Sequence, residues 1–271
     1  MIDRPIRAKK SLGQNFLVDP NIQRRIVEAV DPRPDDTIVE IGPGQGAITQ
    51  HLVEAGARVV AIELDDRLAD LLRHRFADRP NFSLLHKDAL TFEPADVGTE
   101  MSRVKLVGNI PYNITTPLIF HFLARPLRPR VFILMVQKEV ADRILAEVGS
   151  KDYGALSVGV RTIATAERLF NVGRGSFRPV PNVDSSVIRI TPIWPPPYSE
   201  HEEALIRELT RTAFAWRRKQ LQKILRASEA YHLTGDQVSN LHHRTGIDLN
   251  LRPETLTPEQ FVLLARALQN P

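Results

Sequence analysis

Segments typical of strands alternate with segments typical of helices between residues 37 and 136, and this alternation constrains the fold more than any other feature. The predicted strands are short apolar runs, and apolar residues recur at helical spacing between them. Strands that alternate with helices indicate an α/β fold, in which a parallel sheet is covered by helices on both faces. The strands are expected at residues 37–41, 58–62, 82–86, 104–107 and 130–136, and helices are expected to begin near residues 20, 65, 117 and 136.

Beyond residue 150 the pattern changes from alternation to helices alone. Two more strands are predicted, which could add an antiparallel edge to the sheet, and only helices follow them. These later elements are expected as a helix at residues 154–164, strands at 166–170 and 186–190, and helices at 202–214, 219–225, 235–241 and 258–268.

A proline-rich segment marks the expected boundary between two domains. Three consecutive prolines at residues 195–197 enforce an extended, semi-rigid spacer. The larger domain is expected at residues 1–195 and begins with an extended arm, residues 1–19. A small helical domain is expected at residues 196–271. With 271 residues, 42% of them hydrophobic, the chain is long enough to bury a core in each domain.

Composition excludes several kinds of protein and site. The absence of cysteine excludes a disulfide framework, a thiolate nucleophile and a cysteine-ligated zinc site. The eight histidines show no spacing suited to a shared metal ion, so no metal is expected. No apolar run approaches the roughly 20 residues of a membrane span, and the N-terminus lacks the apolar segment of a secretory signal. We therefore expect a cytoplasmic protein.

A glycine-rich loop joins the first predicted strand to the helix after it. Gly42 and Gly44 permit positive φ angles and let a ligand approach the backbone closely. Glu63 ends the second predicted strand, where a carboxylate can accept hydrogen bonds from both hydroxyls of a ribose. Two cofactors fit this loop. Gly42-x-Gly44-x-x-Ala47 satisfies a relaxed dinucleotide fingerprint, and S-adenosylmethionine sites have a similar loop and acid.

Three further side chains favour S-adenosylmethionine over a nicotinamide cofactor. Glu40 lies just before the loop, where a carboxylate suits an ammonium or sulfonium group better than a pyrophosphate. Asp88 follows the third predicted strand and can accept a hydrogen bond from an adenine amino group, although it could also simply cap a turn. Asn109 follows the fourth strand. Polar residues at four successive strand ends indicate one binding site, because parallel strands end at the same sheet edge.

The sequence Asn109-Ile110-Pro111-Tyr112 suits chemistry on the exocyclic amine of a planar ring. The amide oxygen of Asn109 and the backbone carbonyl of Ile110 can both accept from an NH₂ group. Pro111 stiffens the turn, and Tyr112 offers a face on which a base can stack. An ordinary strand-to-loop turn can have the same sequence.

Basic residues are bunched along the chain, although the net charge is only +4. A clustered basic surface can follow a phosphate backbone, although the same residues could simply form solvated helix faces. If the partner is RNA, charge reversal at Arg217 and Lys219 is expected to weaken its binding. The candidate clusters are the N-terminal arm, Arg24 with Arg25, and the basic residues between Arg217 and Arg226.

Four motifs, in order and spacing, resemble those of the ribosomal RNA adenine N6,N6-dimethyltransferases. Within this family the chain is most similar to the small-subunit enzymes of bacteria, which dimethylate two adjacent adenines near the 3′ end of 16S rRNA. The motifs are K-S-L-G-Q-N-F-L at residues 10–17, the cofactor loop at 38–46, N-I-P-Y at 109–112 and F-R-P-V-P-N-V-D-S at 177–185.

The resemblance implies a fold, a cofactor and partners. The fold would be a Rossmann-like class I S-adenosylmethionine-dependent methyltransferase sheet with a small all-helical C-terminal domain that binds RNA. The cofactor would be S-adenosylmethionine, which leaves as S-adenosylhomocysteine. The substrate would be 16S rRNA within an immature 30S subunit. We expect the protein to act as a monomer.

The resemblance also implies roles for single residues. Asn15 and Leu17 of the arm would fold over the cofactor, with Gln14 as a neighbour. The other cofactor contacts implied are Gly42 at the amino-acid end, Gly44 nearby, Glu63 at the ribose, Asp88 at the adenine, and Asn109. The catalytic group implied is Asn109, Ile110, Pro111 and Tyr112, with Phe177 as a second stacking ring, although Phe177 could instead be a core aromatic.

Three alternatives stay open. The large-subunit (23S) rRNA adenine N6-methyltransferases share most of the motifs. A nicotinamide-dependent oxidoreductase is permitted by the loop, but the chain lacks an evident proton donor such as a Tyr-x-x-x-Lys pair. A non-catalytic RNA-binding or assembly factor could use the same scaffold, and the intact 109–112 motif argues against it.

Overall fold

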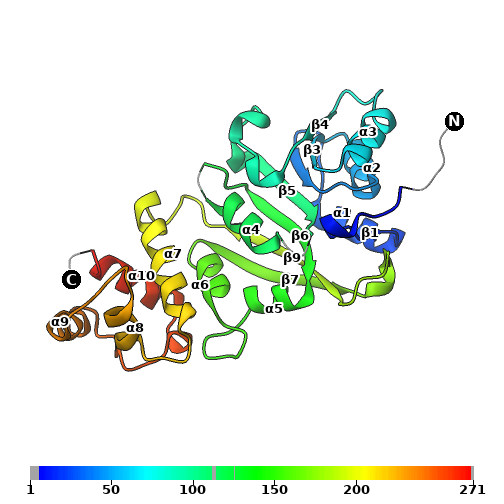
Figure 1. Cartoon of the computed structure of the whole chain (residues 1–271). Coiled ribbons are helices and arrows are strands. Elements are labelled where there is room, and N and C mark those ends of the chain that lie inside the picture. The colour runs from blue at the N-terminus through cyan, green and yellow to red at the C-terminus, as the bar shows by residue number, and fades with distance from the viewer. Residues whose placement is uncertain (1–5, 112–113, 125, 270–271) are drawn as a thin grey trace. The chain divides into compact units, whose positions relative to one another are not determined.

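The computed structural model describes residues 6–111, 114–124 and 126–269 (Figure 1). Its contacts divide the chain into two compact units. The first comprises Met1–Ala141 and Glu167–Pro192, and the second comprises Asp142–Ala166 and Ile193–Pro271. The sequence predicts a single boundary near residue 195, whereas in the structure the 142–166 segment belongs with the C-terminal helices.

A seven-stranded sheet forms the framework of the first unit, with strand order β4-β3-β2-β5-β6-β9-β7 (Figure 1). The pairs β2–β3, β3–β4, β2–β5 and β5–β6 are parallel, and β6–β9 is antiparallel. Both the predicted parallel sheet and the predicted antiparallel addition are confirmed. The strands are β2 (Thr37–Ile41), β3 (Arg58–Glu63), β4 (Phe82–His86), β5 (Val104–Asn109), β6 (Val131–Gln137), β7 (Ala164–Val172) and β9 (Ser185–Pro192).

Capping residues mark both ends of the first helix, α1 (Pro20–Val30). The Asp19 side chain accepts hydrogen bonds from the first backbone N–H groups of α1, and Asp31 ends that helix in a left-handed conformation. One apolar cluster joins α1 and α2 to residues of β2, β3, β5 and β6, so these two helices cover one face of the sheet. The helices are α1 (Pro20–Val30), α2 (Ala47–Glu54), α3 (Asp66–Arg75), α4 (Thr115–Leu123) and α5 (Lys138–Ile144).

The N-terminal arm is more structured than the sequence predicts. Residues Lys10–Leu12 form a 3₁₀ turn, and β1 (Phe16–Leu17) pairs antiparallel with β8 (Phe177–Arg178). Leu17 and Phe177 are 7% and 1% exposed, and they share an apolar cluster with α1 and the sheet. Part of the expected arm is therefore a paired strand that is held against the first unit by the burial of these two side chains.

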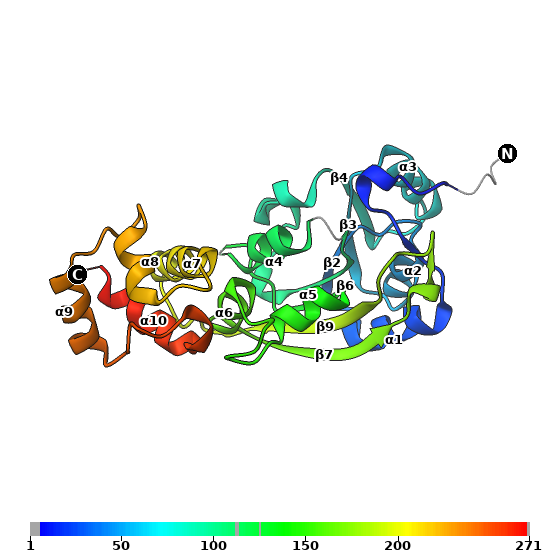
Figure 2. The same ribbon diagram turned by 60° about the horizontal axis from the view of Figure 1, so that its bottom comes forward.

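The second unit is helical (Figure 2). Its core is a single apolar cluster to which α6, α7, α8, α9 and α10 all contribute, with Val158 of α6 and Leu241 of α9 as single buried members. The 142–166 segment joins this core because α6 packs on α7 and the buried Tyr153 hydroxyl donates a 2.8 Å hydrogen bond to the Leu256 carbonyl. The helices are α6 (Ala155–Arg161), α7 (Glu200–Ala215), α8 (Leu221–Ala227), α9 (Gly235–Thr245) and α10 (Pro258–Ala267).

Within the described ranges, no helix is both long and apolar enough to cross a membrane.

Candidate active site

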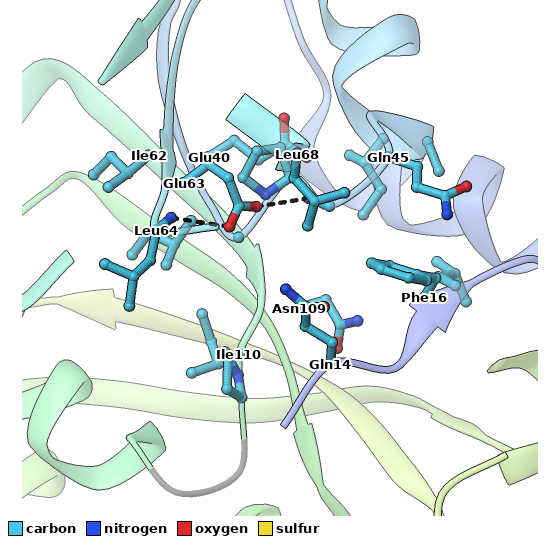
Figure 3. A pocket seen from close by; sticks show the side chains of 18 of the residues that line it. Gln14, Phe16, Glu40, Gln45, Ile62, Glu63, Leu64, Leu68, Asn109 and Ile110 are labelled. Carbon is cyan, nitrogen blue, oxygen red and sulfur yellow. Dashed lines mark hydrogen bonds between the residues drawn. The ribbon is translucent and has the colours of Figure 1, made fainter. Parts of the chain in front are cut away.

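A cavity of about 500 Å³ lies in the first unit at the carboxyl ends of β2, β3, β4 and β5 (Figure 3). The chain connects β2 to β3 on one side and reaches β5 on the other, so this edge is the switch point where open α/β sheets bind ligands. The N-terminal arm supplies a further wall. The lining segments are residues 12–18, the loop after β2, residues 62–64 at the end of β3, 87–89 after β4, and 109–111 at the end of β5.

The glycine loop is held against the end of β3. Gly42 and Gly44 have φ angles of 64° and 59°, which glycine adopts without strain. The Gly42 N–H donates a 3.0 Å hydrogen bond to the Ile62 carbonyl, and the Gly44 N–H donates one of 3.3 Å to Oε2 of Glu63. The loop and the predicted ribose acid are thus brought together, as the sequence predicts.

The carboxylate of Glu63 is oriented by backbone donors. Its Oε1 accepts hydrogen bonds of 2.9 Å from the N–H groups of both Leu64 and Asp65. Among the described residues, its Oε2 accepts only the longer bond from Gly44, which leaves an acceptor position for a ligand hydroxyl. Burial raises the pKa of Glu63, and the three N–H donors oppose that rise. The donors therefore hold the carboxylate in a fixed direction toward the cavity (Figure 3).

Glu40 is a buried carboxylate, and one of its two oxygens lacks a partner among the described residues. It is 2% exposed and lines the cavity, and its Oε2 has no hydrogen-bond partner among the described residues. Burial raises the pKa of Glu40 to about 7, and the nearby charge of Glu63 adds to the rise. Hydrogen bonds with Thr49 oppose the rise only in part. A buried carboxylate oxygen without a partner is costly, and a ligand cation would compensate it. This feature fits the ammonium or sulfonium group of S-adenosylmethionine.

Asn109, the last residue of β5, is oriented by the arm. Its Nδ2 donates a 3.0 Å hydrogen bond to the Asn15 carbonyl, so its Oδ1 remains the acceptor that the side chain offers. The next residue is also fixed, because the Ile110 N–H donates a 3.1 Å bond to the Met135 carbonyl of β6. Asn15, Leu17, Asn109, Ile110 and Pro111 all line the same cavity, as the sequence predicts.

Asp88 fits both of its sequence interpretations. Its Oδ1 accepts a 2.9 Å hydrogen bond from the Leu90 N–H and so caps the short 3₁₀ turn Ala89–Thr91. The half-buried side chain also lines the cavity at the end of β4. The capping bond fixes the position of the carboxyl group, and that position suits the predicted adenine contact.

Two predicted stacking residues have different outcomes. Tyr112 lies outside the described residues. Phe177 does not line the cavity, since it is 1% exposed and belongs to the apolar cluster that contains Leu17. Phe177 is thus placed as the core aromatic that the sequence also allows, where its ring helps to bury the paired strands β1 and β8, and its role as a stacking ring stays a prediction.

Two residues of this region have structural roles that the sequence analysis does not predict. Gly108 precedes Asn109 in β5, and a Cβ there would lie 2.7 Å from the Ile41 carbonyl oxygen, so only glycine allows this close pairing. A glycine inside an apolar strand is a recognisable signal for such an approach. Asp65 is predicted only as a helix start, but its buried side chain also binds two residues of the arm. Nothing local in the sequence indicates that contact.

The basic cluster after α7 divides into two kinds of residue. The Arg217 guanidinium donates to Glu254 at 2.7 Å, to the Ser150 carbonyl at 3.0 Å and to the Lys151 carbonyl. Arg217 thus makes its contacts within the second unit, and its role in binding RNA stays a prediction. Arg218 and Lys219 are exposed, and the neighbouring Trp216 is 59% exposed.

No group of metal-ligating side chains suited to an ion occurs in the part of the chain that the structure describes. The residues that line the cavity instead match the separate parts of a nucleoside cofactor: a carboxylate for a cation, a glycine loop, an acid for the ribose and an acid for the adenine.

The raised pKa of Glu40 predicts that cofactor affinity depends on pH. A cation favours the ionised carboxylate, so affinity should fall roughly tenfold between pH 7.5 and pH 6.0 as Glu40 becomes protonated. The folding stability of the cofactor-free protein should change with pH in the opposite direction. Because the pKa of Glu40 is raised on folding, the stability contributed by its neutral form is lost as pH rises through about 7. Calorimetric titrations with S-adenosylmethionine and S-adenosylhomocysteine test this prediction.

Comparing the two ligands shows which cation pairs with Glu40. Both ligands have an ammonium group, so pairing of Glu40 with that group would make both affinities depend on pH. Only S-adenosylmethionine has a sulfonium, so pairing with the sulfonium would make its affinity alone depend on pH. Glu40→Gln should remove the dependence, and a profile that persists in this variant contradicts the assignment.

This strand order, with a glycine loop after β2, an acid ending β3 and an amide ending β5, defines a Rossmann-like S-adenosylmethionine-dependent methyltransferase. The family model for ribosomal RNA adenine dimethylase matches residues 6–270, and the chain belongs to this family.

Related sequences align with nearly the whole chain. "Ribosomal RNA small subunit methyltransferase A" of Geobacter metallireducens is 44% identical over 97% of this chain and 96% of its own. The protein of the same name from Pseudomonas syringae is 42% identical over 97% and 95%. A crystal structure of a dimethyladenosine transferase from Plasmodium falciparum has a TM-score of 0.73 at 26% identity and covers 92% of this chain and 95% of its own. The 23S rRNA methyltransferase ErmE gives 0.68 at 28% identity, covering 94% and 100%.

These findings confirm the predicted family, fold class, enzyme class and cofactor. The protein is an S-adenosylmethionine-dependent adenine dimethyltransferase of ribosomal RNA, and the nicotinamide alternative is set aside.

Proposed function

We propose that this enzyme dimethylates N6 of two adjacent adenines near the 3′ end of 16S rRNA, within an immature 30S subunit, and acts as a monomer. The names of its relatives support the small subunit, since proteins 40–44% identical to this chain are called small subunit methyltransferases, whereas the 23S enzyme is 28% identical. The observation that carries the chemistry is the hydrogen bond from Asn109 to the Asn15 carbonyl.

That bond decides which atom Asn109 presents to a base. With Nδ2 donated to the arm, Oδ1 and the Ile110 carbonyl are the two acceptors for the hydrogens of an adenine N6 amine. Accepting both hydrogens draws electron density onto the nitrogen, whose lone pair is otherwise delocalised into the ring. When bound, S-adenosylmethionine supplies an electrophilic methyl group. No strong base is needed, because a methylated amine is acidic enough to lose its proton to solvent.

The same acceptors provide selectivity. Stacking contributes roughly 1–3 kcal/mol per base but accepts any base, so Tyr112 alone cannot discriminate. Two acceptors facing the same point favour an amino group and reject a carbonyl oxygen, because the carbonyl would leave both acceptors unpaired. Flipping the target base out of its stack costs a few kcal/mol, and least in a loop.

The proposal is tested by methylation of 30S particles isolated without these modifications, followed by mapping of the altered bases. We expect methyl incorporation only at two adjacent adenines near the 3′ end of 16S rRNA. Fully modified 30S particles are the matched control and should accept no methyl groups. Methylation of 23S rRNA, or of adenines elsewhere in 16S rRNA, contradicts the assignment.

The exposed basic residues Arg218 and Lys219 are proposed to contact RNA phosphates. Reversing both charges should weaken RNA binding and reduce the slope of log K against log salt by about one for each cation removed. Affinity for S-adenosylhomocysteine should not change. Binding is measured by a filter or fluorescence assay across a salt series.

The control for this pair is Arg79→Glu, which reverses an exposed charge in the first unit. Arg217 is left intact, because its substitution would break three hydrogen bonds that hold the second unit together. An unchanged RNA affinity in the double variant excludes these residues as the contact.

A further inference from the structure

The arm that walls the cavity is fixed at two points, one at residues 16–18 and one at Lys9 and Gln14. At the first point, β1 pairs with β8, and the Val18 N–H donates a 2.9 Å bond to the Ser176 carbonyl. Leu17 and Phe177 are buried there in the core. This attachment is apolar and continuous with the interior of the first unit.

At the second point, the arm binds one buried carboxylate. Asp65 lies directly before α3, and its side chain is fully buried. Its Oδ1 accepts from Lys9 Nζ at 3.1 Å, and its Oδ2 accepts from Gln14 Nε2 at 3.0 Å. The Gln14 Oε1 in turn accepts a 2.7 Å bond from the Lys9 N–H, so the two arm residues reach Asp65 as one bonded group.

Asp65 keeps other partners when these two contacts are removed. Arg67 donates to it from Nε at 3.0 Å, from Nη2 at 2.7 Å and from its backbone N–H at 3.1 Å. Release of the arm therefore does not leave a bare buried charge, which would cost several kcal/mol. The contact with Lys9 and Gln14 can break and re-form, whereas the β1 attachment would have to expose core side chains.

Asp65 does not line the cavity itself, although residues 13–15 do. Its effect on a bound cofactor must therefore pass through the arm. The arm segment in question also accepts the hydrogen bond from Asn109.

We propose that Asp65 is a positioning residue that latches the N-terminal arm over the cofactor, and that opening of this latch limits cofactor release. The inference concerns retention of S-adenosylmethionine or S-adenosylhomocysteine and does not depend on which RNA is methylated. The low pKa of Asp65, held well below its usual range by Arg67 and the arm residues, keeps the latch charged throughout the working range of pH.

Asp65→Asn tests the latch, although it also weakens the ion pair with Arg67. Asparagine caps a helix about as well as aspartate, and the backbone N–H that Asp65 donates to Glu63 is retained. We expect S-adenosylhomocysteine to dissociate about tenfold faster in a stopped-flow measurement. The KM for S-adenosylmethionine should rise by a similar factor, while kcat at saturation stays within about twofold. Asp70→Asn, an exposed aspartate on α3, is the matched control and should behave as wild type.

A double-mutant cycle with Lys9→Met separates the latch from a general loss of structure. Lys9→Met alone should also speed dissociation, but it should add little in the Asp65→Asn background, because the shared contact is already lost. Added salt should speed dissociation from wild type more than from either variant. The Lys9 side chain is 40% exposed, so Lys9→Met removes no buried group. If Asp65→Asn fails to fold, the dissociation rate of Lys9→Met alone tests the proposal.

Additive effects, or dissociation rates that match wild type in Lys9→Met, would overturn the proposal. A drop in kcat that follows the loss of thermal stability would also overturn it, since that result indicates structural damage. None of these results bears on the RNA substrate, which the mapping of methylated 30S particles tests separately.

Discussion

Replacing Asn109 with alanine is expected to lower kcat by roughly 100- to 1,000-fold, while the cofactor still binds. The variant loses the side-chain acceptor that faces the target amine, but the glycine loop and Glu63 remain in place. Single-turnover methylation of unmodified 30S particles measures the chemical step, and calorimetry with S-adenosylhomocysteine measures binding.

The control for this variant is Asn171→Ala. Asn171 is an exposed residue of β7 whose Oδ1 accepts a 2.8 Å bond from the Ser186 hydroxyl, and it does not line the cavity. Its removal should leave turnover near the wild-type value. Full activity of Asn109→Ala would refute the role assigned to the amide.

Glu63→Gln is expected to have the opposite kinetic signature. Cofactor affinity should fall by roughly 10- to 100-fold, because a charged acceptor for the ribose is lost and the new amide NH₂ faces backbone donors. The Gly44 N–H, which now bonds to Oε2, would lose its acceptor, and the loop would loosen. With saturating S-adenosylmethionine, kcat should largely recover.

Calorimetry with S-adenosylhomocysteine gives the affinity, and initial rates over a range of S-adenosylmethionine give KM and kcat. Glu28→Gln on the exposed face of α1 serves as the comparison, since it removes the same charge at a residue that does not line the cavity. An unchanged affinity in Glu63→Gln would mean that the carboxylate only fastens the loop and does not contact the cofactor.

The sequence predicts the site well because a parallel sheet turns distant residues into neighbours by a simple rule. Each of Gly42, Glu63, Asp88 and Asn109 follows or ends a different strand, and parallel strands share one carboxyl edge. Apolar runs locate the strands, so the edge and its side chains can be deduced without knowing the fold in detail. The family motifs then add the arm residues Asn15 and Leu17.

Contacts between segments far apart in the chain are what the sequence fails to predict. The pairing of β1 with β8 joins residues about 160 positions apart through only two residues on each side, too few for a strand pattern to be visible. The burial of Phe177 follows from that pairing. The hydrogen bonds of Arg217 to Glu254 and to two backbone carbonyls are also contacts between distant segments. They cannot be predicted from the sequence, because a run of basic residues looks the same whether its side chains face solvent or bind neighbouring residues.

The hydrogen bond between Asn109 and the Asn15 carbonyl has a consequence for the proposed mechanism. In that mechanism one peptide group both walls the cofactor cavity and orients the amide proposed to bind the base. Movement of that peptide would open the cavity and release the amide together. We therefore expect little methyl transfer while the arm is displaced.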